Sequence, residues 1–342
     1  MKKQKNILRC MYWALPCAML FAGCENGTDG ENTEPVELQI NPVVATTRSA
    51  IQEASSMTEV AVYATGGNDY TTEKNNNYAK YAYSGGSWNN NETDKIFLTN
   101  AAATIYGYYP ATNRYNETDK TISVTLVEGD ATTTITAVDN ASSSSTTIAS
   151  ATAEVDCMWA TPVNNVSNAA GKSSVKLTMQ HALSMVSFRV YKDASYKGAG
   201  SLTQFIVENA AGKSMLSKGT SPKMNITNGI ITPGTARNAK YTRSIQGGYT
   251  LVADKDASKK FSFLVLPINE SIGNDNIQAT FTVDGADYPV NLKAPTATGT
   301  DGKWLAGNNN LYTVKLGGTD LEVTTVEVTK WSEVAGDDLE IK

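Results

Sequence analysis

Residues 175–191 read VKLTMQHALSMVSFRVY and contain two short runs, 175–179 and 185–191, that are rich in Val, Leu and Met. Short runs of this composition, bounded by small or polar residues, are typical of β-strands. Runs of the same kind recur on both sides of this stretch, and no window of the chain shows a helical period of useful length. The sequence therefore predicts an all-β protein.

The expected strands form two consecutive groups along the chain. The first group comprises residues 36–40, 59–64, 78–83, 104–109 and 121–127, and the second comprises residues 175–179, 185–191, 202–207, 249–252, 261–267, 277–283, 288–292, 311–316, 321–331 and 339–341. Gly85 and Gly86 predict a hairpin that leads to Trp88. Regular strand spacing in two groups favours two tandem β-sandwiches, in which each sheet buries one face.

The polar stretch 164–174 is the expected boundary between the two domains, which we place at residues 49–172 and 173–342. The Ser- and Thr-rich stretch 131–153 is low in charge, and we expect it to form a long loop or an irregular part of a sheet. The run Tyr106–Tyr109 is interpreted as sheet packing rather than as a platform for sugars.

The start of the chain has the features of an export signal. Its basic residues are Lys2, Lys3, Lys5 and Arg9. The apolar run Met11–Ala22 follows them and is shorter than the roughly 20 residues of a membrane-spanning helix, which is typical of a secretory signal. Residues 20–24, Leu-Phe-Ala-Gly-Cys, resemble the lipobox of bacterial lipoproteins. That resemblance implies that residues 1–23 are removed and that Cys24 carries lipid. Residues 25–35 are polar and read as a flexible tether.

Charge and cysteine content exclude some classes of protein. The chain has 29 Lys and Arg and 34 Asp and Glu; the predicted signal holds four of the basic residues, which leaves 25 against 34 and a net charge of −9. This balance argues against binding of nucleic acid. Cys157 would be the one cysteine left without lipid, so no disulfide is expected in the mature chain. We interpret it as a small buried thiol rather than as a nucleophile paired with His181, the single histidine.

Sequence signatures of catalysis or metal binding are absent. The chain has no phosphate-binding loop, no His-Glu-x-x-His, no Cys-x-x-Cys and no nucleophile elbow. Its many carboxylates leave a glycosidase-type pair open, but nothing in the sequence singles one out. Asn91–Asp94 and Asp337-Asp338 lack the ligand spacing of a calcium loop. The prediction is a protein that is not an enzyme and that has no metal or cofactor.

Several local motifs, in order along the chain, resemble the fimbrillin family, the pilus subunits of anaerobic Gram-negative bacteria. The motifs are Thr46-Thr47-Arg48, Asp156-Cys157-Met158-Trp159-Ala160, residues 175–188, Phe263-Leu264-Val265-Leu266-Pro267, residues 307–314 and residues 326–331. The resemblance implies two transthyretin-like β-sandwich domains in a lipoprotein of the outer membrane. It also implies that an Arg-specific protease removes the first strand, and that a strand of another subunit fills the vacated groove to build a pilus.

The sequence suits this scheme at three places. Val36, Leu38 and Ile40 form the apolar face of the expected first strand, within residues 24–48. Cleavage between Arg48 and Ser49 would release that strand and leave an open sheet edge, which needs a partner. Residues 331–342 are the candidate donor strand, through Trp331, Leu339 and Ile341. His181 matches a recurrent family position, and we interpret it as structural, hydrogen-bonded at the start of a strand.

We therefore expect a structural subunit of a cell-surface pilus (fimbrium) that supports adhesion. Its expected partners are other copies or related pilins, an Arg-specific protease, the outer membrane through lipid, and a host receptor or glycan. One alternative is a non-polymerising adhesin or glycan-binding lipoprotein at a pilus tip or anchor, with residues 331–342 packed in its own sandwich. A surface hydrolase is the other, and it would require a deep cleft with two facing carboxylates.

Overall fold

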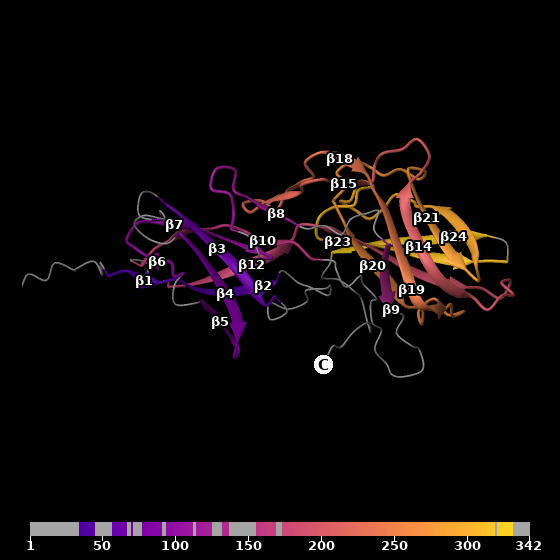
Figure 1. Ribbon diagram of the computed structural model, residues 1–342, viewed down its shortest axis with the longest axis horizontal. Coiled ribbons are helices and arrows are strands. Elements are labelled where there is room, and N and C mark those ends of the chain that lie inside the picture. Colours follow the sequence, from indigo (N-terminus) through magenta and orange to yellow (C-terminus); the bar gives the residue numbers. More distant parts are fainter. Residues whose placement is uncertain are drawn as a thin grey trace, which may run out of the picture.

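Every regular element of the structure, a computed structural model, is a β-strand (Figure 1). It describes residues 34–44, 57–66, 70, 77–90, 94–111, 114–124, 132–136, 155–168, 173–318 and 320–330, with only the backbone for 132–136. The all-β fold class is thereby confirmed, whereas the predicted domain bounds stay predictions. Within these ranges no helix is long and apolar enough to cross a membrane.

The strands follow one another with short connections in most of the chain. In chain order they are β1 (Val36–Glu37), β2 (Gln39–Val44), β3 (Glu59–Thr65), β4 (Tyr78–Ser84), β5 (Ser87–Asn90), β6 (Phe97–Leu98), β7 (Ala103–Tyr109), β8 (Thr121–Ser123), β9 (Thr132–Thr136), β10 (Met158–Ala160), β11 (Val163–Val166), β12 (Ser174–His181), β13 (Ser184–Lys192), β14 (Ser201–Asn209), β15 (Ser217–Gly219), β16 (Lys223–Asn225), β17 (Ile231–Thr232), β18 (Ala236–Asn238), β19 (Lys240–Thr250), β20 (Lys260–Val265), β21 (Ile277–Val283), β22 (Ala286–Asn291), β23 (Asn308–Leu316) and β24 (Leu321–Lys330). The predicted hairpin is confirmed, since β4 and β5 pair antiparallel across Gly85 and Gly86, both with positive φ.

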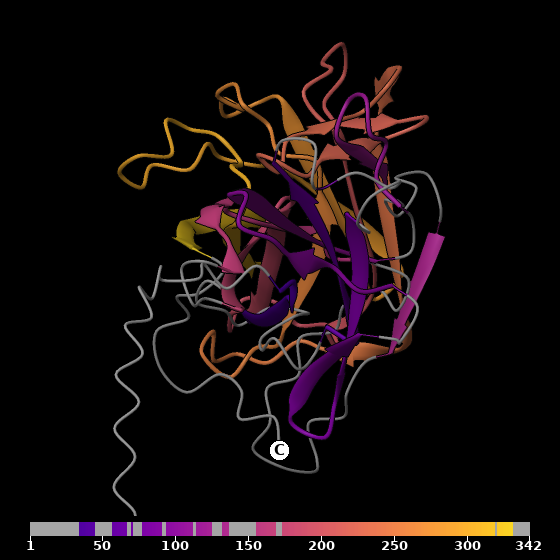
Figure 2. The same cartoon turned by 90° about the vertical axis from the view of Figure 1, so that its left-hand side faces the viewer.

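The first unit, comprising β1–β7 and β10–β12, is built around one curled sheet. The strand order is β2-β12-β10-β7-β3-β4-β5, and β11 pairs with β7. The edge strands β2 and β5 also come into contact, so the sheet curls around a core that includes Leu38, Val62, Trp88 and Leu177. This unit faces the viewer in Figure 2. A strand near the start of the described chain therefore closes the first core.

The second unit, β13–β24, is a two-sheet sandwich. One sheet has the order β20-β13-β23-β24, and the facing sheet has the order β22-β21-β14-β19-β9. Their inner faces meet in a core rich in phenylalanine, where the Phe188 ring on β13 lies 5.3 Å from the Phe281 ring on β21, edge to face. Alternate residues of β13, β21 and β23 enter this core, as the sequence pattern predicts.

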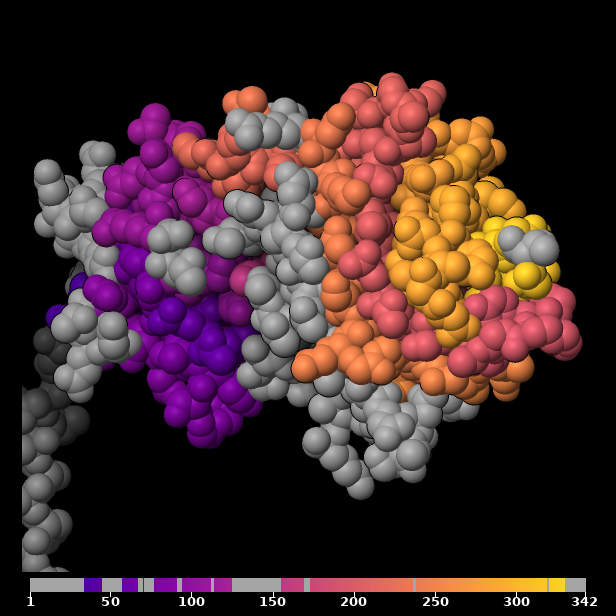
Figure 3. All heavy atoms as spheres, turned by 45° about the vertical axis from the view of Figure 1, so that its right-hand side comes forward, coloured from indigo at the N-terminus to yellow at the C-terminus, as the bar shows by residue number. Residues whose placement is uncertain are grey.

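A third hydrophobic core joins the two units. It contains Tyr63 and Tyr108 of the first unit and Met185, Met224 and Leu264 of the second. Two strands of the region between β7 and β10 pair with the second unit: β8 runs antiparallel to β16, and β9 runs parallel to β19. Figure 3 shows the salmon-coloured segment of the second unit that contains β16 and β17 lying over the violet first unit. The two units are thus packed together over a shared apolar surface.

The pairing of β12 and β13 shows where the chain passes from the first sheet to the second. β12 pairs with β2 and β10 of the first sheet, and β13 pairs with β20 and β23 of the second. The change of sheet therefore falls at Ala182 and Leu183, which are both buried. Within the stretch 131–153, expected to be a loop or irregular sheet, Thr132–Thr136 form β9.

We predict that Gly229 is required where the two units meet. It occupies the turn between β16 and β17 with φ of +71°, and a Cβ there would overlap the indole ring of Trp159 on β10. Gly212 has a similar φ of +74° with nothing within 4 Å of an added Cβ, so Gly212→Ala is the matched control.

Gly212→Ala should cost about 1 kcal/mol of unfolding free energy, the penalty of the left-handed backbone alone. Gly229→Ala should cost roughly 2–4 kcal/mol, because the overlap with the ring adds to that penalty. Urea denaturation of the two variants measures the difference. Equal losses would show that the contact with Trp159 adds nothing.

Candidate functional site

Residues 34–44 form the edge of the first unit and lie where the sequence places the removable strand. β1 pairs with β6, and β2 runs parallel to β12 from Gln39 opposite Ser174 to Val44 opposite Met179. Leu38 is fully buried between the two short strands, and Ile40 is 6% exposed. The third predicted residue, Val36, is only half-buried and lies opposite Leu98.

Alternation explains why this segment fits the edge. Leu38, Ile40 and Pro42 are buried, whereas Gln39 and Asn41 between them are exposed. Pro42 cannot donate a main-chain hydrogen bond, which is tolerated on an edge strand. The segment therefore presents an apolar row to the first core and a polar row to solvent.

Main-chain groups hold the centre of the segment. The Leu38 N–H donates to the Ile96 carbonyl (2.8 Å), and the Gln39 N–H donates to the Ser173 carbonyl (2.6 Å). The buried Tyr81 hydroxyl on β4 donates to the Leu38 carbonyl (2.7 Å). Burial raises the pKa of Tyr81 well above its usual range, so the phenol stays protonated and remains a donor at neutral pH. These three bonds tie residues 38 and 39 to three separate parts of the first unit.

Two further contacts fix the start of the segment. The Asn168 side-chain amide donates to the Glu34 carbonyl (2.9 Å), and Lys95 Nζ lies 2.9 Å from Glu37 Oε2. The side chains of Lys95 and Glu37 are 31% and 27% exposed, so this ion pair is worth only about 1 kcal/mol or less. The ion pair matters more for its position than for its strength. Through it, Lys95 recognises the negative charge of Glu37, the residue directly before the buried Leu38.

The other predicted site residues lie outside the described residues: Cys24, Arg48, Ser49, Trp331, Leu339 and Ile341. In chain order, the bond between Arg48 and Ser49 falls between the end of β2 at Val44 and the start of β3 at Glu59. Trp331 directly follows β24, the edge strand beside β23 in the second unit. A cut at Arg48 would therefore separate β1 and β2 from every other described strand.

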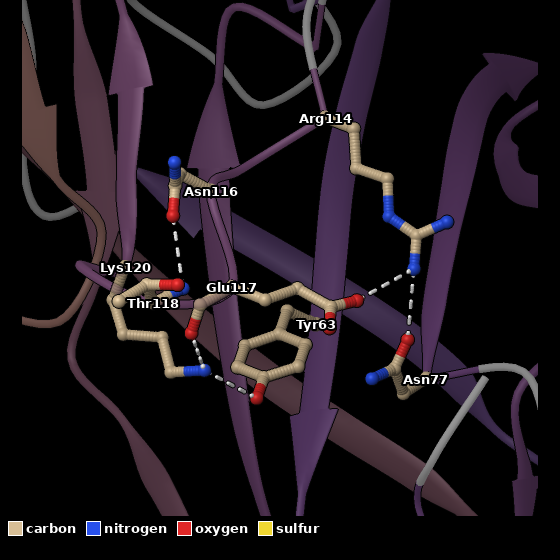
Figure 4. Close-up of polar contacts among 7 residues, drawn as sticks. All are labelled: Tyr63, Asn77, Arg114, Asn116, Glu117, Thr118 and Lys120. Carbon is tan, nitrogen blue, oxygen red and sulfur yellow. Dashed lines mark hydrogen bonds and ion pairs between the residues drawn. The ribbon is translucent and has the colours of Figure 1, made fainter.

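A polar and aromatic cluster covers part of the core between the units (Figure 4). Lys120 Nζ donates to the Tyr63 hydroxyl (3.0 Å) and to the Glu117 carbonyl (2.6 Å), while Arg114 Nη2 donates to Asn77 Oδ1 (3.1 Å). Burial raises the pKa of Tyr63, but hydrogen bonds, the largest from Lys120, outweigh this and leave the pKa lowered.

The aromatic rings of this cluster are buried against one another rather than exposed to solvent. Tyr63 and Tyr115 lie 4.0 Å apart between centroids, and each is less than 5% exposed. In the run Tyr106–Tyr109, Tyr108 is fully buried, Tyr106 is half-buried and stacks on Tyr63, and Tyr109 is half-buried against the first core. This arrangement agrees with the interpretation of the run as sheet packing. The cluster joins the loop before β8 to the first unit.

The single histidine also makes a polar contact at the junction between the units. His181 Nδ1 lies 2.7 Å from Asp156 Oδ2, and both side chains are almost fully buried. His181 is the last residue of β12, so the prediction that it lies at the start of a strand is wrong. Burial raises the pKa of Asp156, and the neighbouring His181 partly opposes this rise. The pair holds the approach to β10 against the end of β12.

Cys157 lies beside this pair but is poorly suited to nucleophilic chemistry. Its thiol is buried and lies 3.9 Å from the Val155 carbonyl. Burial, together with the charge of Asp156, raises the pKa of Cys157 to about 12. Since the thiolate is the reactive form, this environment suppresses reactivity.

Comparison with known proteins gives one family. A family model described as fimbrillin-like matches residues 47–331. Among solved structures, a proposed cell adhesion protein from Bacteroides uniformis is 18% identical with a TM-score of 0.58, over 87% of this chain and 99% of that chain. Another from Bacteroides ovatus is 14% identical with a TM-score of 0.55, over 87% of this chain and 98% of that chain. At these identities the likeness concerns the fold. No curated protein matches the chain.

We predict that Cys157 is inert in the folded protein. With a pKa of about 12, roughly one thiol in 10⁴ is ionised at pH 8, against about a quarter for an ordinary cysteine thiol. Iodoacetamide at pH 8 should leave Cys157 unmodified in the native protein and label it in denaturant. Mass spectrometry of the peptide that contains Cys157 reads the result. Equal labelling in both states would show that the thiol is exposed.

We also predict that Leu38 anchors the edge segment. Leu38→Ala should lower the free energy of unfolding by about 2–5 kcal/mol, because it leaves a cavity in the first core. The neighbouring Gln39 is exposed, so Gln39→Ala should change stability by no more than about 0.5 kcal/mol. Urea denaturation compares the two variants, and a loss as small for Leu38→Ala as for Gln39→Ala would show that the segment contributes nothing to the core.

Proposed function

Because the chain belongs to the fimbrillin-like family, we propose that it is a structural subunit of a cell-surface pilus that assembles by strand exchange. In this proposal the chain is exported as a lipoprotein through Cys24 and held at the outer membrane. An Arg-specific protease then cuts between Arg48 and Ser49 and releases residues 24–48. A strand from residues 331–342 of another copy fills the vacated groove. The residues expected to enter it are Trp331, Leu339 and Ile341.

The observation that carries the proposal is the edge position of residues 34–44. Removing them would uncover one side of β12 and the sites of Leu38 and Ile40 in the first core. Truncating a buried Leu or Ile typically costs about 2–5 kcal/mol, so an empty groove of this kind strongly favours a replacement strand. A donor strand supplies both main-chain hydrogen bonds and alternate apolar side chains.

Because of the strand topology, one proteolytic cut is enough to separate β1 and β2 covalently from the other described strands. β1 and β2 are joined to the remaining described strands only through the chain between Val44 and Met57. Cys157, the free cysteine of the described residues, is buried, so no disulfide ties it to the segment. After cleavage at Arg48 only non-covalent contacts would hold residues 34–44 in place.

The proposal includes adhesion at the cell surface and no enzymatic activity. The histidine is buried and bound to Asp156, which leaves it unsuited to act on an external substrate. The predicted mature charge of −9 disfavours nucleic acid as a partner. The partners that fit are other copies of the chain or related pilins, the protease, the membrane through lipid, and a host receptor or glycan.

A non-polymerising adhesin at a pilus tip or anchor is the second candidate. The two similar structures from Bacteroides uniformis and Bacteroides ovatus are proposed cell adhesion proteins, and cell adhesion as such does not require polymerisation. The N-terminal residue of the protein isolated from its native surface separates the candidates. Ser49 indicates a processed stalk subunit, and lipidated Cys24 indicates an anchor or a non-polymerising lipoprotein.

We predict that an Arg-specific protease converts the purified precursor into polymers. The expected products are a chain that begins at Ser49 and a ladder of oligomers by size-exclusion chromatography and mass spectrometry. Arg48→Lys keeps the positive charge but resists this protease, so it is the matched control and should stay monomeric. A wild-type chain that loses residues 24–48 and still remains monomeric would contradict the stalk model.

A further inference from the structure

The edge segment presents four consecutive residues with distinct environments. Glu37 pairs with Lys95, Leu38 is fully buried, Gln39 is exposed and Ile40 is buried. Read along the chain, the groove therefore accepts an acidic residue, a leucine, an outward polar residue and an isoleucine. Each of these preferences follows from a contact rather than from the sequence alone.

The same order of residues recurs at Asp338-Leu339-Glu340-Ile341. Asp320-Leu321-Glu322-Val323 has a related order, but its last three residues are the start of β24. There Leu321 and Val323 are buried in the core of the second unit, and they pair with Leu316 and Val314 of β23. This segment therefore already pairs within the sheet of its own subunit and is not free to act as a donor strand.

We propose that Asp338–Ile341 of a second copy occupies the groove in the register of Glu37–Ile40. This inference rests on the proposed strand exchange and adds the position of each donor residue. Leu339 takes the site of Leu38, and Ile341 takes the site of Ile40. In this register Trp331, seven residues before Asp338, falls ahead of the groove that residues 34–44 occupy. Asp338 faces Lys95, and Glu340 points to solvent as Gln39 does.

The fit of the two apolar sites supports this register. Leucine replaces leucine and isoleucine replaces isoleucine, so neither site is left with a cavity or overfilled. The bonds from the Tyr81 hydroxyl and to the Ile96 carbonyl involve only the main chain of residue 38. Any residue except proline can make both bonds there, so they add affinity with little selection of the sequence. Selection then depends on the two apolar side chains and on the charge beside Lys95.

Charge also favours one direction of the donor strand. In the proposed register the donor runs parallel to β12, as β2 does, and Lys342 falls at the exposed position of Asn41. A donor that ran the opposite way could still place Ile341 and Leu339 in the two apolar sites. It would then put Lys342 opposite Lys95, and like charges in contact oppose binding. The ion pair therefore distinguishes the parallel strand from the reversed one.

The test uses the full chain, cut with an Arg-specific protease, and follows the rate and extent of polymer formation by size-exclusion chromatography. Asp338→Lys should slow assembly at least fivefold, because it replaces an attraction to Lys95 with a repulsion; a factor of five corresponds to about 1 kcal/mol. Lys95→Glu should have a similar effect. The double variant, Asp338→Lys with Lys95→Glu, restores opposite charges and should recover assembly to within twofold of wild type.

Glu340→Lys is the matched control, since it makes the same charge change two residues away at the outward position and should leave assembly unchanged. Leu339→Ala should abolish most assembly, and thermal unfolding of the uncut variant checks that the cores are intact. Assembly of the Asp338→Lys and Leu339→Ala variants at the wild-type rate would overturn the register while leaving strand exchange in place. Failure of the cut wild-type chain to assemble at all would overturn both.

Discussion

The parallel pairing of β2 with β12 is the contact on which the first unit depends. β2 closes one edge of the curled sheet, and Leu38 and Ile40 complete its core. Parallel strands cannot be joined by a tight turn, so β2 reaches its place only through chain that lies far from β12 in sequence. A strand of this kind contributes fully to the core yet is joined to the other described strands on one side only. That combination makes it separable without breaking any other strand.

β12 also links the groove to the second unit. It continues through Ala182 and Leu183, both buried in the core between the units, into β13, which lies between β20 and β23. β8 and β9, which lie in the chain between β7 and β10 of the first unit, pair with β16 and β19 of the second and so connect the units again. In a pilus built as proposed, a pull on a strand in the groove would act along β12 and pass to β13 and its neighbours. The load would then be shared by whole ladders of hydrogen bonds and by the apolar junction.

The sequence predicted those parts of the fold that depend on local alternation. The period-two pattern of Leu38 and Ile40 and the glycines of the β4–β5 hairpin are visible without a structure. For β9 the expectation of a loop or irregular sheet could not be narrowed, because Thr132–Thr136 has no apolar alternation and its pairing with β19 joins residues more than 100 positions apart. The passage from the first sheet to the second at Ala182 carries no local signal, because residues 175–179 and 185–191 are alike in composition. Tyr81 and Lys95, which recognise residues 37 and 38, carry no local signal for that role, since they lie 43 and 58 positions away.

The likeness between Glu37–Ile40 and Asp338–Ile341 bears on why a covalent cut should start assembly. If both segments fit the same sites, their contact energies are similar, and fit alone cannot favour the incoming strand. The resident strand is linked to its own groove, which gives it an effective concentration of about millimolar, whereas a neighbouring subunit must bind from dilute solution. Cleavage at Arg48 would remove that advantage and leave two equally matched strands to compete. Crowding of subunits on the membrane surface then raises the effective concentration of the incoming strand, whereas the released segment is no longer linked to the groove.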